Sequence, residues 1–167
     1  MSSKKITVVS QSAAQTKRIG TLLGKFLTPG AVVALKGELG SGKTTMVKGI
    51  AKGLGVASEK IVSSPTFVLI HEYAGREKIY HLDWYRLNSV EGMDKALAEE
   101  CFNSKGVTLV EWPERGREVI PRQAIAVHLS HQALHSRKIS ILFPESPKAE
   151  VLKELKIIVA RFRNSGG

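Results

Sequence analysis

The chain has 167 residues and a mass of 18.2 kDa, a length that fits one domain. Hydrophobic residues make up 43% and charged residues 24% of the sequence, which excludes a disordered or fibrous chain. The 25 basic and 15 acidic side chains give a formal net charge of +10, so the sequence favours an acidic or polyanionic partner without identifying it.

The apolar residues predict strands and helices that alternate along the chain. Residues 6–9 form a β-branched strand, and Ser12 and Gln15 then form a capping box at the start of a helix that ends before Pro29. The apolar run at 31–35 predicts a strand buried on both faces. The expected elements that follow are, in chain order, a helix at 43–54, strands at 67–73 and 78–82 around a hairpin turn, a helix at 90–102, a strand at 107–110, a hairpin with strands at 125–129 and 138–143, and a basic helix at about 148–163. This alternation predicts a single α/β domain over 1–167, with a mixed sheet because hairpins occur.

The charge is unevenly distributed along the chain. Residues 1–60 carry a net charge of +8, residues 61–120 carry −3, and residues 121–167 carry +5. Solubility alone does not need such segregation, although basic helices that present solvated faces would also produce it. Both interpretations of the basic ends stay open at this point.

The sequence favours a cytoplasmic protein. The single cysteine, Cys101, excludes an internal disulfide, suits a reducing compartment and is expected in the core. No apolar run reaches 18 residues, so we expect no membrane span. The first fifteen residues contain two lysines without a long apolar stretch after them, unlike a secretory signal.

The strongest motif is a phosphate-binding loop. Residues 37–44 read GELGSGKT and fit the pattern G-x-x-x-x-G-K-[ST] between an apolar strand and a helix. Glycines allow backbone amides to approach phosphate oxygens, and the start of the helix directs its positive dipole end at the same anion. Lys43 would then contact the β- and γ-phosphates, and the Thr44 hydroxyl would bind Mg²⁺.

The loop indicates a nucleoside triphosphate, because chance produces this pattern in only about 1% of chains of this length. The sequence lacks the N-K-x-D motif that reads guanine and the D-x-x-G switch of GTPases. ATP is therefore favoured over GTP. ATPases, kinases and transporters share such a loop, so it does not choose the reaction.

Further polar residues follow the predicted strands. Glu111 ends the strand at 107–110, where an acid of a phosphate-loop enzyme holds Mg²⁺ directly or through water; an ordinary surface carboxylate is the alternative. Asp83 could take the metal role instead, or position the attacking water. His81 shares the strand face of Asp83, and we expect a half-buried, hydrogen-bonded histidine without a catalytic role. For Arg86 we expect a surface ion pair.

A loop rich in hydroxyl groups, Ser63 to Thr66, lies about twenty residues after the phosphate loop. In that position Thr66 could sense the γ-phosphate as part of a switch segment. Ser-Pro turns are common, so spacing alone supports this interpretation only weakly.

Four segments occur in a fixed order: KGELGSGKTT, SSPTFVLI, YHLDWYRL and LVEWPERG. With them the sequence closely resembles the bacterial TsaE (YjeE) family, from the first strand to about Phe143. The resemblance implies a three-layer P-loop NTPase fold with a mixed, mostly parallel central sheet and β-hairpins. It also implies slow Mg²⁺-dependent ATP hydrolysis that serves threonylcarbamoyladenosine formation at position 37 of tRNAs reading ANN codons. The expected protein partners are TsaD and TsaB, with tRNA reached through the complex or directly and no membrane involved.

The resemblance also assigns roles to residues. Lys43 becomes the phosphate clamp, Thr44 and Glu111 become the Mg²⁺ ligands, and Asp83 becomes a required polar residue of the family's HxDxYRL motif. Lys43, Asp83 and Glu111 are thus the expected catalytic residues. The expected ATP contacts are Thr16, Glu38, Leu39, Gly40, Ser41, Gly42, Lys43, Thr44, Thr45, Thr66, Trp112 and Arg137, with Thr16 and Arg137 on the adenine side.

Two other functions remain as alternatives. A small-molecule kinase would share the loop but would need an arginine-bearing lid, for which 113–118 is short. A non-catalytic, nucleotide-gated binding module would also share the loop.

Overall fold

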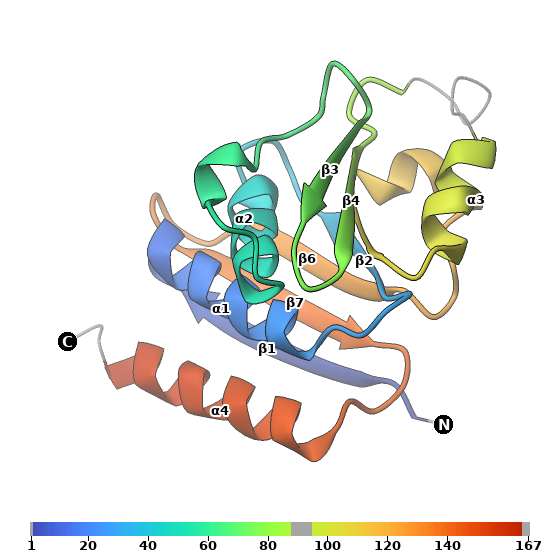
Figure 1. Ribbon diagram of the computed structural model, residues 1–167. Helices are drawn as coiled ribbons and strands as arrows, with labels where there is room; N and C mark the ends of the chain where they lie inside the picture. The colour runs from blue at the N-terminus through green and yellow to red at the C-terminus, as the bar shows by residue number, and fades with distance from the viewer. Residues whose placement is uncertain (1, 88–94, 165–167) are drawn as a thin grey trace.

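A computed structural model describes residues 2–87 and 95–164. Its strands form one mixed sheet in the order β1-β7-β6-β2-β5-β4-β3 (Figure 1). The strands are β1 (Lys4–Ser10), β2 (Val32–Lys36), β3 (Ile70–Ala74), β4 (Lys78–Asp83), β5 (Val107–Glu111), β6 (Ile125–His131) and β7 (Arg137–Phe143). The helices are α1 (Ala13–Phe26), α2 (Lys43–Gly53), α3 (Lys95–Asn103) and α4 (Ala149–Asn164), with short 3-10 helices η1 (Glu59–Ile61) and η3 (Pro113–Gly116).

The centre of the sheet is parallel and its edges are antiparallel. Strand β2 pairs in parallel with β5 and β6, and β5 pairs in parallel with β4. Strands β3 and β7 run antiparallel to their neighbours, and β1 pairs antiparallel with β7. Five of the seven strands therefore run in one direction, which confirms the predicted mixed α/β fold.

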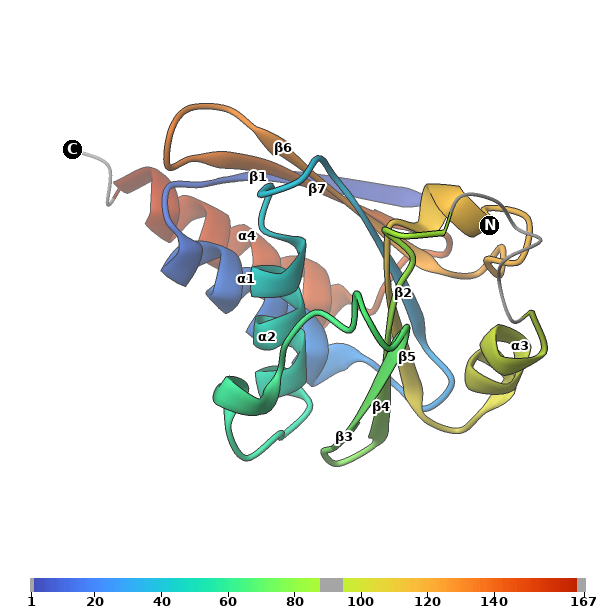
Figure 2. The same ribbon diagram turned by 90° about the horizontal axis from the view of Figure 1, so that it is seen from above.

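The sheet lies between two helical layers (Figure 2). Helices α1, α2 and α4 cover one face, and α3 covers the other near β4 and β5. The β5 side chains alternate between the two cores: Leu109 joins the α1–α2 core, whereas Val110 joins the α3 core. Cys101 is buried in the α3 core, as its expected packing role requires. In the described part of the chain, no helix combines the length and the apolar character needed to cross a membrane.

Most predicted elements are confirmed within a few residues. The side chain of Ser12 accepts a hydrogen bond from the backbone amide of Gln15, which confirms the predicted cap of α1. The strand expected at 67–73 starts only at Ile70. The amides of Val68 and Leu69 both bond back to the carbonyl of Pro65, so the chain turns there, and Leu69 has a φ of 66°. Of the helix expected at 90–102, residues 90–94 lie outside the described residues.

Helices α1 and α2 approach each other closely along a line of glycines. A Cβ atom at Gly20 would lie 2.5 Å from the backbone carbonyl oxygen of Met46, and the equivalent atom at Gly49 would clash with the carbonyl of Lys17. Backbone atoms cannot move aside as a flexible side chain can. The glycines therefore fix the position of α2, and with it the position of the loop at its N-terminus.

Substitution of Gly20 by alanine should destabilise the fold although alanine favours helices. Overpacking against backbone costs about 1–3 kcal/mol, which exceeds the helix-propensity gain of about 0.5–1 kcal/mol. Urea unfolding of Gly20→Ala should show a lower midpoint than that of Lys25→Ala, a control at an exposed position of the same helix. Equal midpoints would show that the two helices can separate at no cost.

Candidate functional site

The loop at 37–44 connects the central strand β2 to the N-terminus of α2. Gly40 and Gly42 have φ values of 75° and 100°, in the left-handed region that glycine adopts without strain. Gly42 is the N-cap of α2 and no side chain caps the first turn there, in contrast to Ser12 at α1. The free amides and the positive dipole end of α2 therefore point at the same place, which suits an anion.

Lys43 lies inside this loop. Its Nζ atom donates hydrogen bonds to the carbonyls of Gly37 and Glu38, at 2.6 and 2.9 Å, and lies 4.0 Å from the ring centroid of Trp112. Burial lowers the pKa of Lys43 from its ordinary value, and the nearby carboxylates of Glu111, Glu114 and Asp83 oppose that change. A buried ammonium group held mainly by neutral carbonyls is well placed to bind a further anion.

Glu111 ends strand β5 and connects the loop to the sheet. Its carboxylate accepts hydrogen bonds from the Thr44 hydroxyl, at 3.0 and 3.2 Å, and from the Nε2 atom of His81 at 2.9 Å. Glu111 is only 2% exposed, so the alternative of an ordinary surface carboxylate is wrong. The two oxygen-bearing residues expected to bind Mg²⁺, Thr44 and Glu111, are in direct contact.

His81 is fully buried, which corrects the half-buried histidine expected from the sequence. Its Nδ1 atom lies 3.3 Å from the Tyr73 hydroxyl, which donates to the carbonyl of Ser63 at 3.0 Å. Polar contacts thus run from Thr44 through Glu111, His81 and Tyr73 to the start of the hydroxyl-rich loop. The sequence gives no sign of Tyr73, because it meets His81 only through the β3–β4 hairpin.

Asp83 ends strand β4 and is the register partner of Glu111. Its Oδ2 atom accepts hydrogen bonds from Ser64 and from Thr66, the latter at 3.1 Å, and its Oδ1 atom accepts the backbone N–H of Tyr85 at 2.8 Å. Asp83 therefore positions the loop that the sequence predicts to be a switch segment. Asp83, His81 and Glu111 share one sheet face, the face that α2 covers.

These residues surround one cavity of about 340 Å³. Its lining consists of Leu39, Gly40, Gly42, Lys43, Thr44, Thr45, Ser64, Thr66, Asp83, Tyr85, Glu111 and Trp112. The cavity thereby brings together ten of the predicted site residues: six from the loop and the start of α2, together with Thr66, Asp83, Glu111 and Trp112. Ser64 and Tyr85 were not predicted, although both are in motifs that the sequence singled out.

The adenine-side candidates line a second cavity of about 530 Å³ that shares Gly40, Gly42 and Thr45 with the first. Thr16 and Arg137 both line it, together with Gln11, Ser12, Ala13 and His135. Arg137 also donates a hydrogen bond to the carbonyl of Gly40, at 3.3 Å. Glu38 and Ser41 line neither cavity. Glu38 is exposed, whereas the hydroxyl of Ser41 is buried and has no hydrogen-bond partner within the described residues.

Two surface residues differ from expectation. Arg86 forms no ion pair within the described chain; its guanidinium group lies 4.0 Å from the ring centroid of Phe67, which is 80% exposed. Arg115 and Arg117 are the arginines of 113–118, the segment judged short for a kinase lid, and Arg115 donates a hydrogen bond from the short helix η3 to the carbonyl of Leu87 at 2.8 Å. This contact ties the segment to the protein body, which disfavours its use as a lid.

The residues present fit a triphosphate with Mg²⁺. The uncapped amides of α2, the buried ammonium of Lys43 and the orphaned hydroxyl of Ser41 are all donors suited to phosphate oxygens. Thr44 and Glu111 offer the hard oxygen ligands that Mg²⁺ prefers. Among the described residues, no group of three or more His, Cys, Asp or Glu could hold a metal. A Mg²⁺ ion here would thus need phosphate and water for its remaining ligands, as is usual beside nucleotides.

Comparison with known proteins gives a consistent result. The family model named "Threonylcarbamoyl adenosine biosynthesis protein TsaE" matches residues 10–139. A protein of Treponema pallidum with the name "tRNA threonylcarbamoyladenosine biosynthesis protein TsaE" is 43% identical over 133 residues, which cover 80% of this chain and 97% of that protein. The protein of that name from Bacillus subtilis is 41% identical over 127 residues, 75% of this chain and 78% of its own. The crystal structure of Bacillus subtilis YdiB superposes with a TM-score of 0.73 at 28% identity and covers 100% of this chain and 99% of that one.

The two tryptophans should distinguish the cavity from the core. Trp112 lines the cavity beside Lys43, whereas Trp84 is buried in the α3 core. Addition of ATP should change the tryptophan fluorescence of the wild-type protein and of Trp84→Phe, and should leave Trp112→Phe almost unchanged. A nucleotide response that survives in Trp112→Phe would place the ligand away from this cavity.

Proposed function

This chain belongs to the TsaE family of tRNA threonylcarbamoyladenosine biosynthesis proteins, and from that premise we propose that it is a Mg²⁺-dependent ATPase of this modification. One observation carries the proposal: the Thr44 hydroxyl and the Glu111 carboxylate meet beside the uncapped start of α2, inside the cavity that Lys43 lines. Loop, cation and metal-binding oxygens thus meet at the carboxyl ends of parallel strands, where α/β proteins bind nucleotides.

Each residue has a distinct role in this proposal. The loop amides and Lys43 bind the phosphates, and Lys43 exchanges its contacts with the Gly37 and Glu38 carbonyls for phosphate oxygens. Thr44 and Glu111 would hold Mg²⁺, which would supply positive charge against the charge that develops on the phosphates. Trp112 covers the ammonium of Lys43 and excludes water from one side of it. The second cavity, with Thr16 and Arg137, receives the base.

Asp83 acts through the switch loop. It holds the hydroxyls of Ser64 and Thr66 at the cavity wall, so that these hydroxyls face the end of the phosphate chain. The same carboxylate can orient a water molecule for attack on the terminal phosphate. His81 keeps the carboxylate of Glu111 in one orientation and is a positioning residue.

The family's process implies partners as well as substrate. We propose that TsaD and TsaB perform the transfer to tRNA and that this chain supplies the ATP cycle that resets their complex. The contacts of Arg115 with the protein body favour this function over a small-molecule kinase. A passive nucleotide-gated module would bind ATP without hydrolysing it, so a measurement of ATP turnover distinguishes it from the proposed ATPase.

Lys43→Ala should reduce ATP turnover by about 100-fold or more, because it removes a buried cation from the phosphates. Lys52→Ala, an exposed lysine on the same helix, should retain wild-type turnover. Phosphate release measured with TsaD, TsaB and tRNA present tests both variants. Equal turnover in wild-type and Lys43→Ala protein would exclude this cavity as the site of hydrolysis.

Reconstitution tests the biological role. With TsaD, TsaB and tRNA present, repeated turnovers of adenosine modification should require this chain and ATP, and Lys43→Ala should support at most a single turnover. Modification that continues at the same rate without this chain would contradict the proposed role even if the chain hydrolyses ATP.

A further inference from the structure

The excess positive charge is concentrated in one helical layer. Helices α1, α2 and α4 together contain ten Lys or Arg residues and two acidic residues, a net charge of +8, whereas α3 on the opposite face has a net charge of −1. The whole chain has a net charge of +10, so this layer holds most of the excess. A surface that is basic only for solubility would spread its charge over both faces.

Two of these ten cations have a place of their own in the fold. Lys43 lines the nucleotide cavity, and Lys17 forms an ion pair with Glu59 at 2.8 Å. Five of the others are exposed on α1 and α4, two helices that pack against each other, and we call them the basic face: Arg18, Lys25, Lys153, Lys156 and Arg163. Two acidic residues, Glu150 and Glu154, line the hollow between the two helices together with Lys25 and Lys153. Within the described residues, none of the five basic-face residues forms an ion pair within 4.0 Å.

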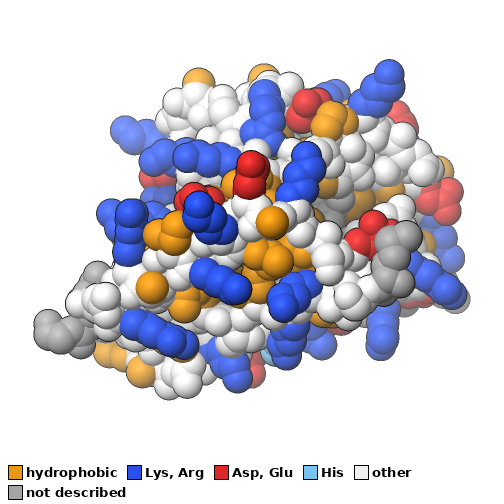
Figure 3. Space-filling model, turned by 90° about the horizontal axis from the view of Figure 1, so that it is seen from below, with side chains coloured by type: hydrophobic (Ala, Val, Ile, Leu, Met, Phe, Trp, Pro, Cys, Tyr) orange, Lys and Arg blue, Asp and Glu red, His pale blue; other side chains and the backbone are white. Residues whose placement is uncertain are grey.

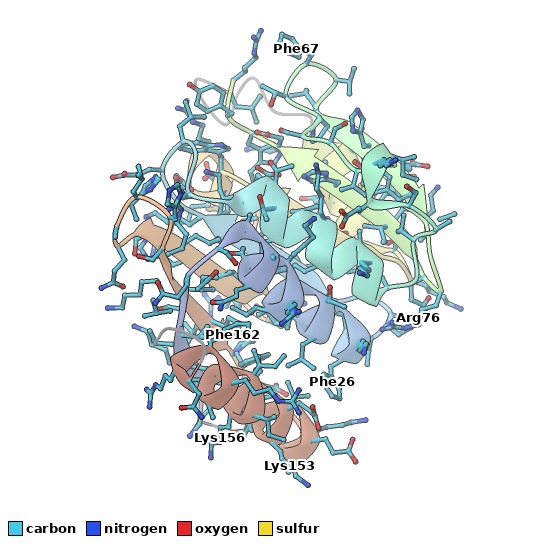
Figure 4. The ribbon with its side chains drawn as sticks, turned by 90° about the vertical axis from the view of Figure 1, so that its left-hand side faces the viewer. Phe26, Phe67, Arg76, Lys153, Lys156 and Phe162 are labelled. Atoms are coloured by element: carbon cyan, nitrogen blue, oxygen red, sulfur yellow. The ribbon has the colours of Figure 1, made fainter. Side chains whose placement is uncertain are left out.

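The basic face is regular along α4. Lys153, Lys156 and Arg163 lie at i, i+3 and i+10, which places them on one side of the helix over about 15 Å of its length. Lys153 and Lys156 project from the outer side of α4 (Figure 4). Seen from below, Lys and Arg side chains outnumber Asp and Glu side chains on this side of the molecule, and hydrophobic side chains are exposed between them (Figure 3).

The opposite side of α4 is already used for packing. Val151, Leu155 and Phe162 are buried against the main core, so α4 has no apolar stripe left to insert into a membrane. The five cations are on long, exposed stems without an exposed Trp or Tyr among them, unlike the aromatic anchors typical of protein interfaces. Exposed charges spaced along a helix suit the phosphate backbone of a nucleic acid.

We propose that the basic face binds the phosphate backbone of folded RNA directly. The charge distribution favours a polyanion independently of the proposed function. The choice of RNA among polyanions rests on the proposed function in tRNA modification. The face lies at the opposite end of the molecule from Phe67 and the switch loop, so RNA on it leaves the nucleotide cavity open (Figure 4). Helix α4 lies beyond residue 139, where the match to the family model ends, whereas Arg18 and Lys25 lie within the matched region.

The test measures binding of the isolated chain to an unmodified tRNA transcript over a range of salt concentrations. The triple variant Lys153→Gln/Lys156→Gln/Arg163→Gln should bind at least about tenfold more weakly and lower the slope of log K against log salt by about 2–3, because each phosphate contact contributes a slope of about one. The double variant Arg18→Gln/Lys25→Gln should lower the slope by about 1–2.

The matched control removes the same net charge from the other side of the molecule. Lys95, Lys105 and Arg117 are exposed on or beyond α3 and η3, and their triple glutamine variant should bind tRNA within twofold of wild type. Equal weakening in both triple variants would show that only net charge matters and would overturn the proposal. Absence of tRNA binding by the wild-type chain at 50 mM salt would overturn it too.

Competitors identify the class of partner. If poly-glutamate, or vesicles with anionic lipid, displace tRNA as well as duplex RNA does at equal charge, an acidic protein or a membrane is the partner and the proposal is wrong. ATP turnover of the basic-face variants, measured without RNA, should equal that of wild type. Failure of the RNA contact is thus separable from failure of the proposed ATPase function, which the Lys43 variant reports.

Discussion

The arrangement of the site depends on the buried carboxylate of Glu111. Glu111 is almost without solvent, and an unpaired charge at such a position costs several kcal/mol, so its partners are obligatory. It has two: the hydroxyl of Thr44 from α2 and the ring of His81 from β4. Through them the carboxylate joins α2 to the sheet, and the glycines of α1 and α2 set the distance between these two helices. A nucleotide with Mg²⁺ would take over part of this pairing, so the site is built to respond to its ligand.

Much of the fold was predictable because its signals are local. A cap at Ser12, a continuous apolar run at β2 and the hairpin of β6 and β7 each depend on neighbouring residues, and the structure confirms all three. The failure at 67–69 has a tertiary cause. Those residues are apolar and β-branched or aromatic in part, yet Asp83 holds the hydroxyls just before them and the chain turns instead of pairing. Local propensity cannot report a constraint that comes from another strand.

The sequence predicts those residues of the site that belong to motifs with a known chemical role. The loop residues, Asp83 and Glu111 converge as expected because parallel strands end at the same edge of the sheet. The sequence underestimates His81, because its two partners, Tyr73 and Glu111, are on β3 and β5, and only the register of β3, β4 and β5 brings them together. The basic face is a similar case. Charge counts along the chain showed basic ends, but only the fold shows that α1, α2 and α4 form one layer.

If Glu111 and Thr44 form the metal side of a triphosphate site, the ATP affinity must depend on Mg²⁺ through these two residues. Titration calorimetry would give the ATP affinity with Mg²⁺ and with EDTA for wild type, Glu111→Gln and Glu118→Gln, the last an exposed glutamate as the matched control. We expect Mg²⁺ to tighten ATP binding by about tenfold or more in wild type and in Glu118→Gln, and Glu111→Gln to lose most of this gain. An equal Mg²⁺ effect in Glu111→Gln and wild type would contradict this expectation.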